Sequence, residues 1–181
     1  MPLLKNDIYT TDYIYSLPEG ERAELIDGVI YDMAPPSSIH QELSWELSAE
    51  IRNYIKKNGG KCKAYAAPYA VFLENNNTTY VEPDISVICD KSKLNEHGCN
   101  GAPDWIIEIV SPSSRRMDYF TKLIKYRISG VREYWIVDPA TERTTIYQYD
   151  VDDAPMIFDF NQTITVGIYG DLKITISELL K

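Results

Sequence analysis

Two acidic residues stand out because each lies in a stretch that otherwise has the character of a β-strand. Glu108 is the one charged residue in the apolar run 105–110, and Asp84 follows Pro83 in the run 81–88. A carboxylate in an apolar strand is costly unless it is paired or bound to a cation. Two carboxylates on neighbouring strands could share a hard divalent cation, which would activate water and neutralise charge on a phosphate. Asp84 and Glu108 are therefore candidate metal ligands.

Both acids also have a plainer interpretation. Asp84 could be a turn residue, because aspartate side chains favour turns. Glu108 could lie at the solvent end of its strand, or pair with Arg132 or Lys122. The residues alone leave these alternatives open.

The elements that must position the two acids can be read from turn signals and hydrophobic spacing. Residues 23–33 predict a β-hairpin, because Asp27-Gly28 suits a type I′ turn. A helix follows, capped by Ser38 with Gln41 completing a capping box, and it ends at residues 58–60. Its apolar residues recur every four positions and predict one buried stripe: Leu43, Leu47, Ile51 and Ile55.

The strands are expected at residues 63–73, 80–89, 105–110 and 134–137, with further strands in the tail at 144–149 and 163–180 and a terminal helical turn. A second helix at 114–129 lies between two of them, so a βαβ crossover is predicted. The expected class is α/β or α+β, with a mixed sheet flanked by helices and an N-terminal hairpin.

Helical spacing in 114–129 gives a prediction of which side chains face inward. At about 100° per residue, an apolar arc emerges that should be buried: Met117, Phe120, Leu123, Ile124 and Ile128. Lys122 falls closer to this arc than Lys125, which should lie in solvent. The rings of Tyr119 and Tyr126 flank Lys122 and could direct it toward Glu108.

Composition bounds the class of protein. A chain of 181 residues predicts one domain, and the net charge of −9 disfavours a nucleic-acid coat protein. Residues 111–132 are an exception, with six basic residues and one acidic residue, and could meet a phosphate backbone or simply be solvated. No apolar run could span a membrane, and residues 1–7 show no secretory signal. Three cysteines without a Cys-x-x-Cys predict reduced thiols and a cytoplasmic location.

Several short motifs, taken in order, resemble the PD-(D/E)XK nuclease superfamily, and most closely its branch of Uma-type restriction-endonuclease-like proteins. The resemblance covers about residues 17–139 of a single domain 1–181, with additional strands at 140–181. The matching positions are Glu24-Leu25-Ile26-Asp27-Gly28, His40, Pro83-Asp84, Glu108-Ile109-Val110-Ser111-Pro112-Ser113, Asp118, Lys122, Tyr126, Gly130-Val131 and Glu133-Tyr134-Trp135-Ile136-Val137-Asp138-Pro139.

This resemblance implies an endonuclease that hydrolyses DNA with Mg²⁺ or Mn²⁺. The cation would be held by Asp84, Glu108 and the backbone carbonyl of Ile109. The superfamily's lysine normally lies two residues after the glutamate, where this chain has Val110; Lys122 on the following helix would replace it.

The resemblance and the residue types together suggest further roles. The supporting residues would be Glu24, His40 and Tyr126, and the contacts to the DNA backbone would be Arg115, Arg116 and Lys125. A homodimer is expected.

The sequence leaves other interpretations of these residues open. Lys122 could form an ordinary i,i+4 pair with Asp118, His40 could be a hydrogen-bonding residue at a helix start, and Glu24 could face solvent from its hairpin. The whole chain could be a non-catalytic nucleic-acid-binding or interaction protein on a nuclease-like scaffold, or another metal-dependent phosphoesterase or small-molecule enzyme.

Overall fold

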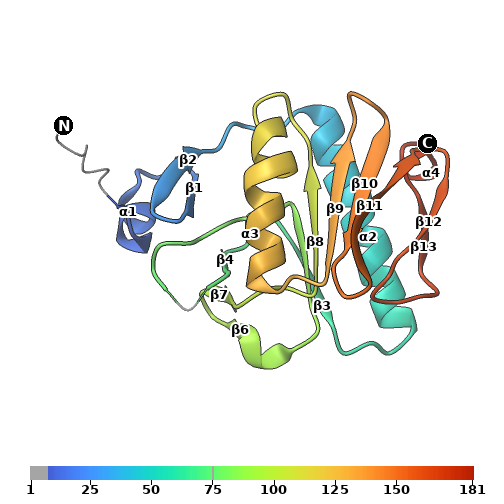
Figure 1. Cartoon of the computed structure of the whole chain (residues 1–181), viewed down its shortest axis with the longest axis horizontal. Coiled ribbons are helices and arrows are strands. Elements are labelled where there is room, and N and C mark those ends of the chain that lie inside the picture. The colour runs from blue at the N-terminus through green and yellow to red at the C-terminus, as the bar shows by residue number, and fades with distance from the viewer. Residues whose placement is uncertain (1–7, 75) are drawn as a thin grey trace.

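The computed structural model describes residues 8–74 and 76–181, and its centre is a six-stranded mixed sheet (Figure 1). The strand order is β11-β10-β9-β8-β5-β3, and β8 pairs with β9 in parallel while the other neighbours are antiparallel. The strands are β3 (Lys63–Ala66), β5 (Ile85–Ile88), β8 (Trp105–Ile109), β9 (Glu133–Asp138), β10 (Arg143–Gln148) and β11 (Asp152–Asp159). The mixed sheet is as predicted, although β11 is a strand that the pattern missed.

The two long helical segments cover opposite faces of this sheet (Figure 1). α2 (Ser38–Lys57) buries its four-residue apolar stripe against Trp105 and Ile107, as the spacing predicts. Its N-cap is Ser37 rather than Ser38, because the Ser37 side chain accepts the backbone N–H of His40 at 3.4 Å. The other face, with Ile106, packs on the crossover helix, which consists of η2 (Met117–Thr121), a π-helical turn, and α3 (Lys122–Ser129).

The N-terminal hairpin forms with the predicted turn. β1 (Ala23–Ile26) and β2 (Val29–Asp32) are antiparallel, and Asp27 and Gly28 have φ of 51° and 79°. Both positive values fit the type I′ turn that Asp-Gly favours. The short helix α1 (Thr11–Ser16) contacts β1.

The remaining elements are short. β4 (Val71–Phe72), β6 (Leu94–Asn95) and β7 (Gly98–Asn100) form a three-stranded sheet, with η1 (Lys91–Lys93) before β6. At the C-terminus, β12 (Thr163–Thr165), β13 (Lys173–Thr175) and α4 (Ile176–Leu179) bury Ile164, Ile174 and Ile176 in the core on the α2 side. The tail therefore closes the end of that core.

The crossover helix is oriented largely opposite to the prediction, since only Met117 and Leu123 of the expected apolar arc pack, half-buried, against the core. Phe120, Ile124 and Ile128 are 65%, 62% and 66% exposed, whereas Asp118, Lys122 and Lys125 are buried. The assumption that an inward face is apolar fails here, because this helix meets carboxylates of the hairpin and of β8. Lys122 is inward because its partners Glu24 and Glu108 are buried there. Lys125 is inward because Asp27 and Glu74 lie over it.

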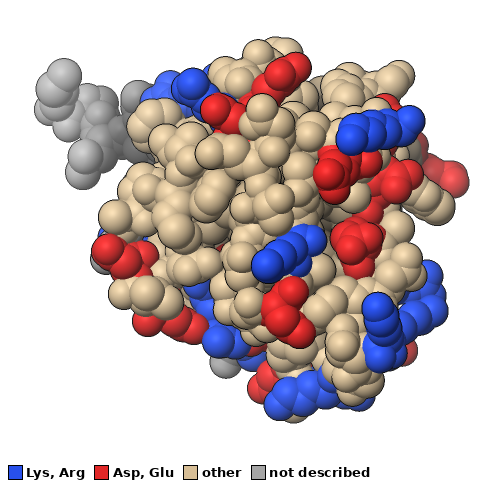
Figure 2. All heavy atoms as spheres, turned by 90° about the vertical axis from the view of Figure 1, so that its right-hand side faces the viewer, with Lys and Arg blue, Asp and Glu red and all other residues tan. Residues whose placement is uncertain are grey.

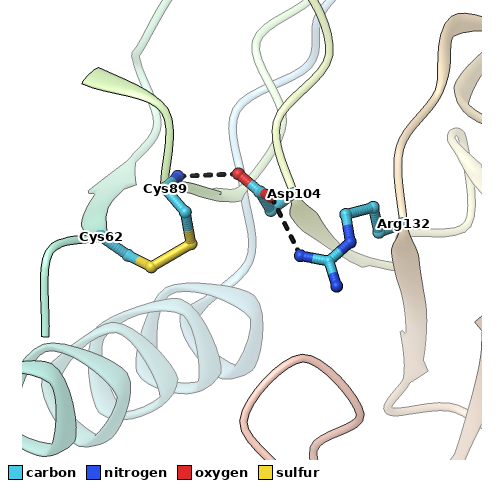
Figure 3. The surroundings of a disulfide bond; sticks show 4 residues. All are labelled: Cys62, Cys89, Asp104 and Arg132. Carbon is cyan, nitrogen blue, oxygen red and sulfur yellow. Dashed lines mark hydrogen bonds and ion pairs between the residues drawn. A yellow bond between two sulfur atoms is a disulfide. The ribbon is translucent and has the colours of Figure 1, made fainter.

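A disulfide joins Cys62 to Cys89, contrary to the expectation of reduced thiols (Figure 3). The antiparallel register that pairs Lys63 with Ile88 places these two cysteines opposite each other, one position beyond β3 and β5. Cys89 also donates its backbone N–H to Asp104, which pairs with Arg132. Sequence spacing cannot show this, because the pairing depends on strand register.

Two expectations concern location. In the part of the chain that is described, no helix is long and apolar enough to cross a membrane, as predicted. The expectation that no secretory signal begins the chain concerns residues 1–7, which lie outside the described residues.

Lys125 connects three parts of the fold, so replacing it should loosen the hairpin. Its ammonium lies 2.5 Å from Asp27 Oδ1 and 2.6 Å from Glu74 Oε1, and the side chain is 5% exposed. We expect Lys125→Met to lower the free energy of unfolding by about 1–2 kcal/mol, measured by urea denaturation. Hydrogen exchange should accelerate first in residues 23–32. Arg116→Met, at an exposed position, is the control, and an equal loss in both variants would contradict this role.

Candidate active site

The strand register brings Asp84 and Glu108 together. β5 and β8 are antiparallel with Ile85 opposite Ile107, so the next positions, Asp84 and Glu108, are also opposite each other. The backbone N–H of Asp84 lies 3.4 Å from Glu108 Oε2, and the N–H of Ile109 donates to Asp84 Oδ2 at 2.7 Å. The two carboxylates therefore lie on one side of the sheet, where β5 begins and β8 ends.

Lys122 reaches the same point from the start of α3. Its Nζ lies 2.9 Å from Glu108 Oε1, 2.8 Å from Glu24 Oε2 and 3.9 Å from Asp118 Oδ1. Tyr126, one turn further on, donates its hydroxyl to Glu108 Oε1 at 2.5 Å. The lysine is therefore part of a cluster that includes the i,i+4 pair with Asp118, rather than an isolated surface pair.

Glu24 lies in the cluster and does not face solvent. It is 5% exposed, and its Oε1 accepts the backbone N–H of Glu82 at 3.0 Å while its Oε2 contacts Lys122. Glu82 is in turn held by Arg22 and by the hydroxyl of Tyr80. The hairpin therefore supplies an acid to the site, and a second ion pair holds the adjoining backbone.

His40 approaches from the N-terminal turn of α2. Its Nε2 lies 3.1 Å from Asp84 Oδ2, while its buried Nδ1 has no hydrogen-bond partner among the described residues. Burial alone would lower the pKa of His40, but the hydrogen bond and the charge of Asp84 outweigh it and raise the pKa overall. A charged imidazole is therefore favoured beside this carboxylate.

Asp118 is a position of the family resemblance to which sequence reasoning gave no role beyond an i,i+4 pair with Lys122. It is 1% exposed, and the hydroxyl of Ser114 donates to its Oδ2 at 2.6 Å. Burial raises its pKa to about 6, against the opposing effect of Lys122. The spacing of Ser114, Asp118 and Lys122, four residues apart each time, is the sequence signal that could have placed all three on one face.

Negative charge exceeds positive charge in this cluster. Four carboxylates, those of Glu24, Asp84, Glu108 and Asp118, surround two cationic groups, the ammonium of Lys122 and the imidazole of His40. Burial lowers the pKa of Lys122, but its acidic neighbours outweigh this and raise it well above the usual value. Burial also raises the pKa of Glu108, with Lys122 opposing. Excess negative charge in a buried site is an arrangement that a divalent cation can compensate.

The oxygens left free fit a hard cation. Glu108 Oε1 is taken by Lys122 and Tyr126, whereas its Oε2 has only the long contact to the Asp84 backbone. No described residue donates to Asp84 Oδ1, since the contacts of this side chain use Oδ2. Over residues 8–74 and 76–181, no three His, Cys, Asp or Glu side chains are arranged to hold a metal ion. Two carboxylate oxygens, supplemented by water, suit Mg²⁺, which commonly uses one or two protein carboxylates.

The predicted backbone-binding residues do not join this cluster. Arg115 pairs with Asp138 at 2.7 Å, and Arg116 is exposed. Lys125 is buried between Asp27 and Glu74, so it is not available to contact DNA. The prediction that Lys125 lies in solvent is wrong, because the hairpin turn covers it.

The cluster lies in a cleft of about 1070 Å³. One wall is α2 and another is the chain from Tyr31 to Pro36, while β3 contributes Lys63 and Tyr65. Glu24, His40, Asp84, Glu108, Asp118 and Lys122 all line it. The acids therefore lie against a space that a ligand can enter.

Removing the buried ammonium should be more costly than removing a hydroxyl from the same carboxylate. We expect Lys122→Met to lower the free energy of unfolding by about 3–5 kcal/mol, because three buried carboxylates lose their counter-charge. Tyr126→Phe should cost only about 1 kcal/mol. Denaturant unfolding of both variants tests this order, and a Lys122→Met protein as stable as the parent would show that the ammonium does not hold the cluster.

Comparisons with known proteins gave one family model, two curated relatives and a similar solved structure. A family model described as "Uma2: Putative restriction endonuclease" matches residues 10–170, further at both ends than the 17–139 expected. Two uncharacterized proteins of Synechocystis sp., slr1290 and sll1609, are 26% and 25% identical over 77% and 71% of this chain, and 73% and 72% of their own lengths. A crystal structure of a protein from Anabaena variabilis, titled a putative nuclease, superposes with a TM-score of 0.75 at 23% identity, covering 94% of this chain and 96% of that one. The last match confirms the nuclease-like fold.

Proposed function

This chain belongs to the Uma2 family of restriction-endonuclease-like proteins, and on that premise we propose that it is a Mg²⁺-dependent endonuclease hydrolysing DNA phosphodiester bonds. The observation that carries the proposal is that carboxylates outnumber cationic groups in a cluster that lines the cleft. Two carboxylate oxygens of this cluster, Asp84 Oδ1 and Glu108 Oε2, are left free to bind a cation. A divalent cation bound there would activate a water and neutralise charge on a scissile phosphate.

Each residue has a defined part in the proposal. Asp84, Glu108 and the carbonyl of Ile109 would hold Mg²⁺ or Mn²⁺, which supplies an activated water and compensates charge on the phosphate. Lys122 stays protonated among its carboxylates, so it would orient the attacking water or stabilise developing negative charge as a hydrogen-bond donor. Glu24 and Tyr126 position this machinery by fixing Lys122 and Glu108.

The basic segment contributes less to the DNA surface than its composition suggests. Lys122 and Lys125 are buried, and Arg115 and Arg132 are paired with acids. Figure 2 shows that acidic and basic side chains are interleaved on the face that carries the C-terminal strands, without a continuous basic patch. Arg116, which is exposed, remains the proposed backbone contact of this segment.

Glu108→Gln is the direct test, because it removes the carboxylate charge while keeping shape. We expect Mg²⁺-dependent cleavage of plasmid or oligonucleotide DNA to fall by at least about 100-fold, with a circular dichroism spectrum like that of the parent. Glu42→Gln on the outer side of α2 is the matched control and should cleave normally. Retained cleavage by Glu108→Gln would refute the assignment.

Calorimetry distinguishes the enzyme from the alternative, a non-catalytic binding or interaction protein on the same scaffold. The proposal expects saturable Mn²⁺ binding to the wild-type protein and its loss in Asp84→Ala. Absence of a saturable site, together with DNA binding that Asp84→Ala does not change, would favour the non-catalytic alternative.

We also propose a homodimer, with the apolar stripe Phe120, Ile124 and Ile128 as the surface that buries on association. Three large side chains, all exposed and four residues apart on one helical face, can pack against the same stripe of a second copy. Ile124→Glu should then convert a dimer to a monomer in light scattering. A wild-type protein that is monomeric at high concentration would contradict this.

A further inference from the structure

The α2 wall of the cleft carries a row of side chains that the proposed chemistry does not use. Gln41, Ser44, Trp45, Ser48, Ala49 and Arg52 all line the cleft. With His40 they form neighbouring rows at four-residue spacing along one helical face, which spans about 18 Å from His40 to Arg52. The His40 end of this wall therefore lies at Asp84, and the Arg52 end lies away from it.

Trp45 is unusual because its side chain is exposed to solvent. It is 75% exposed, whereas Trp105 and Trp135 are fully buried. Tryptophan is costly to leave in water, and its flat ring is the side chain best suited to stacking. A largely exposed indole on the wall of a cleft, a little over one turn from His40, is a surface for a planar ligand group.

The same wall has polar groups without partners. The hydroxyl of Ser48 is buried and unpaired within the described residues. Arg52, two turns beyond Trp45, and Lys63 on β3 are exposed, and neither forms an ion pair with any side chain that the structure describes. Two unpaired cations that line the same cleft as an exposed indole match a ligand that combines phosphates with planar bases.

We infer that the α2 wall is a subsite for single-stranded DNA, in which Trp45 stacks on an unpaired base and Arg52 and Lys63 contact backbone phosphates. This inference rests on the proposed nuclease function for the position of the scissile phosphate. A paired base inside a duplex has no free ring face for the indole, so stacking requires an unpaired or extruded nucleotide. Asp32, on the wall formed by residues 31–36, repels phosphates, so the α2 wall is the better place for the backbone.

Binding without cleavage tests the subsite separately. In the Glu108→Gln background and in EDTA, a fluorescein-labelled oligo(dT) of about 15 nucleotides should bind by anisotropy, with Trp45→Ala weakening affinity about 10- to 100-fold and Trp45→Phe weakening it less. Tyr15→Ala removes another exposed aromatic residue, outside the cleft, and is the matched control. Arg52→Met should reduce the salt dependence of binding by about one unit of slope.

Intrinsic fluorescence gives an independent readout, because Trp45 is exposed and the other two tryptophans are buried. Oligo(dT) should quench the wild-type signal and protect it from iodide, and Trp45→Phe should abolish both effects. The subsite is overturned if Trp45→Ala binds within about two-fold of its parent, or if a blunt hairpin duplex binds as tightly as oligo(dT). Either result leaves plasmid cleavage by the wild-type protein, which tests the proposed function, unaffected.

Discussion

The ammonium of Lys122 is the point on which the rest of the structure depends. It joins Glu24 of the hairpin, Glu108 of the central strand β8 and Asp118 of its own helix, all nearly inaccessible to water. Buried charges are tolerated only when they are paired and hydrogen-bonded. The hairpin, the sheet and the crossover helix must therefore take up positions that satisfy this one group.

This charge pairing is incomplete, and the carboxylate oxygens left unpaired give the site its capacity to bind a cation. The cluster keeps more carboxylates than cations, with Asp84 Oδ1 and Glu108 Oε2 available at the cleft floor. A fold selected for stability alone would balance these charges or replace them with apolar groups. Perturbed carboxyl groups in a cleft are typical of functional sites, which is why the imbalance supports the metal-dependent proposal.

The same constraint shapes the outer surface. Because η2 and α3 turn their charged residues inward, Phe120, Ile124 and Ile128 are left in water. Several cations of the basic segment 111–132 form ion pairs within the protein, as Lys125 does with Asp27 and Glu74. The cations that remain free at the cleft, such as Arg52 and Lys63, come from α2 and β3 instead.

Local patterns in the sequence determined the hairpin, the stripe of α2 and the places of the main strands along the chain, because turn propensity and apolar spacing act over a few residues. They also singled out Asp84 and Glu108, and the family resemblance added Lys122. Only the tertiary structure decided that Asp84 lies opposite Glu108, that Cys62 meets Cys89, and that the crossover helix faces inward with its charges. Strand register and buried ion pairs join residues far apart in the chain, and hydrophobic periodicity carries no information about a core whose contacts are ionic.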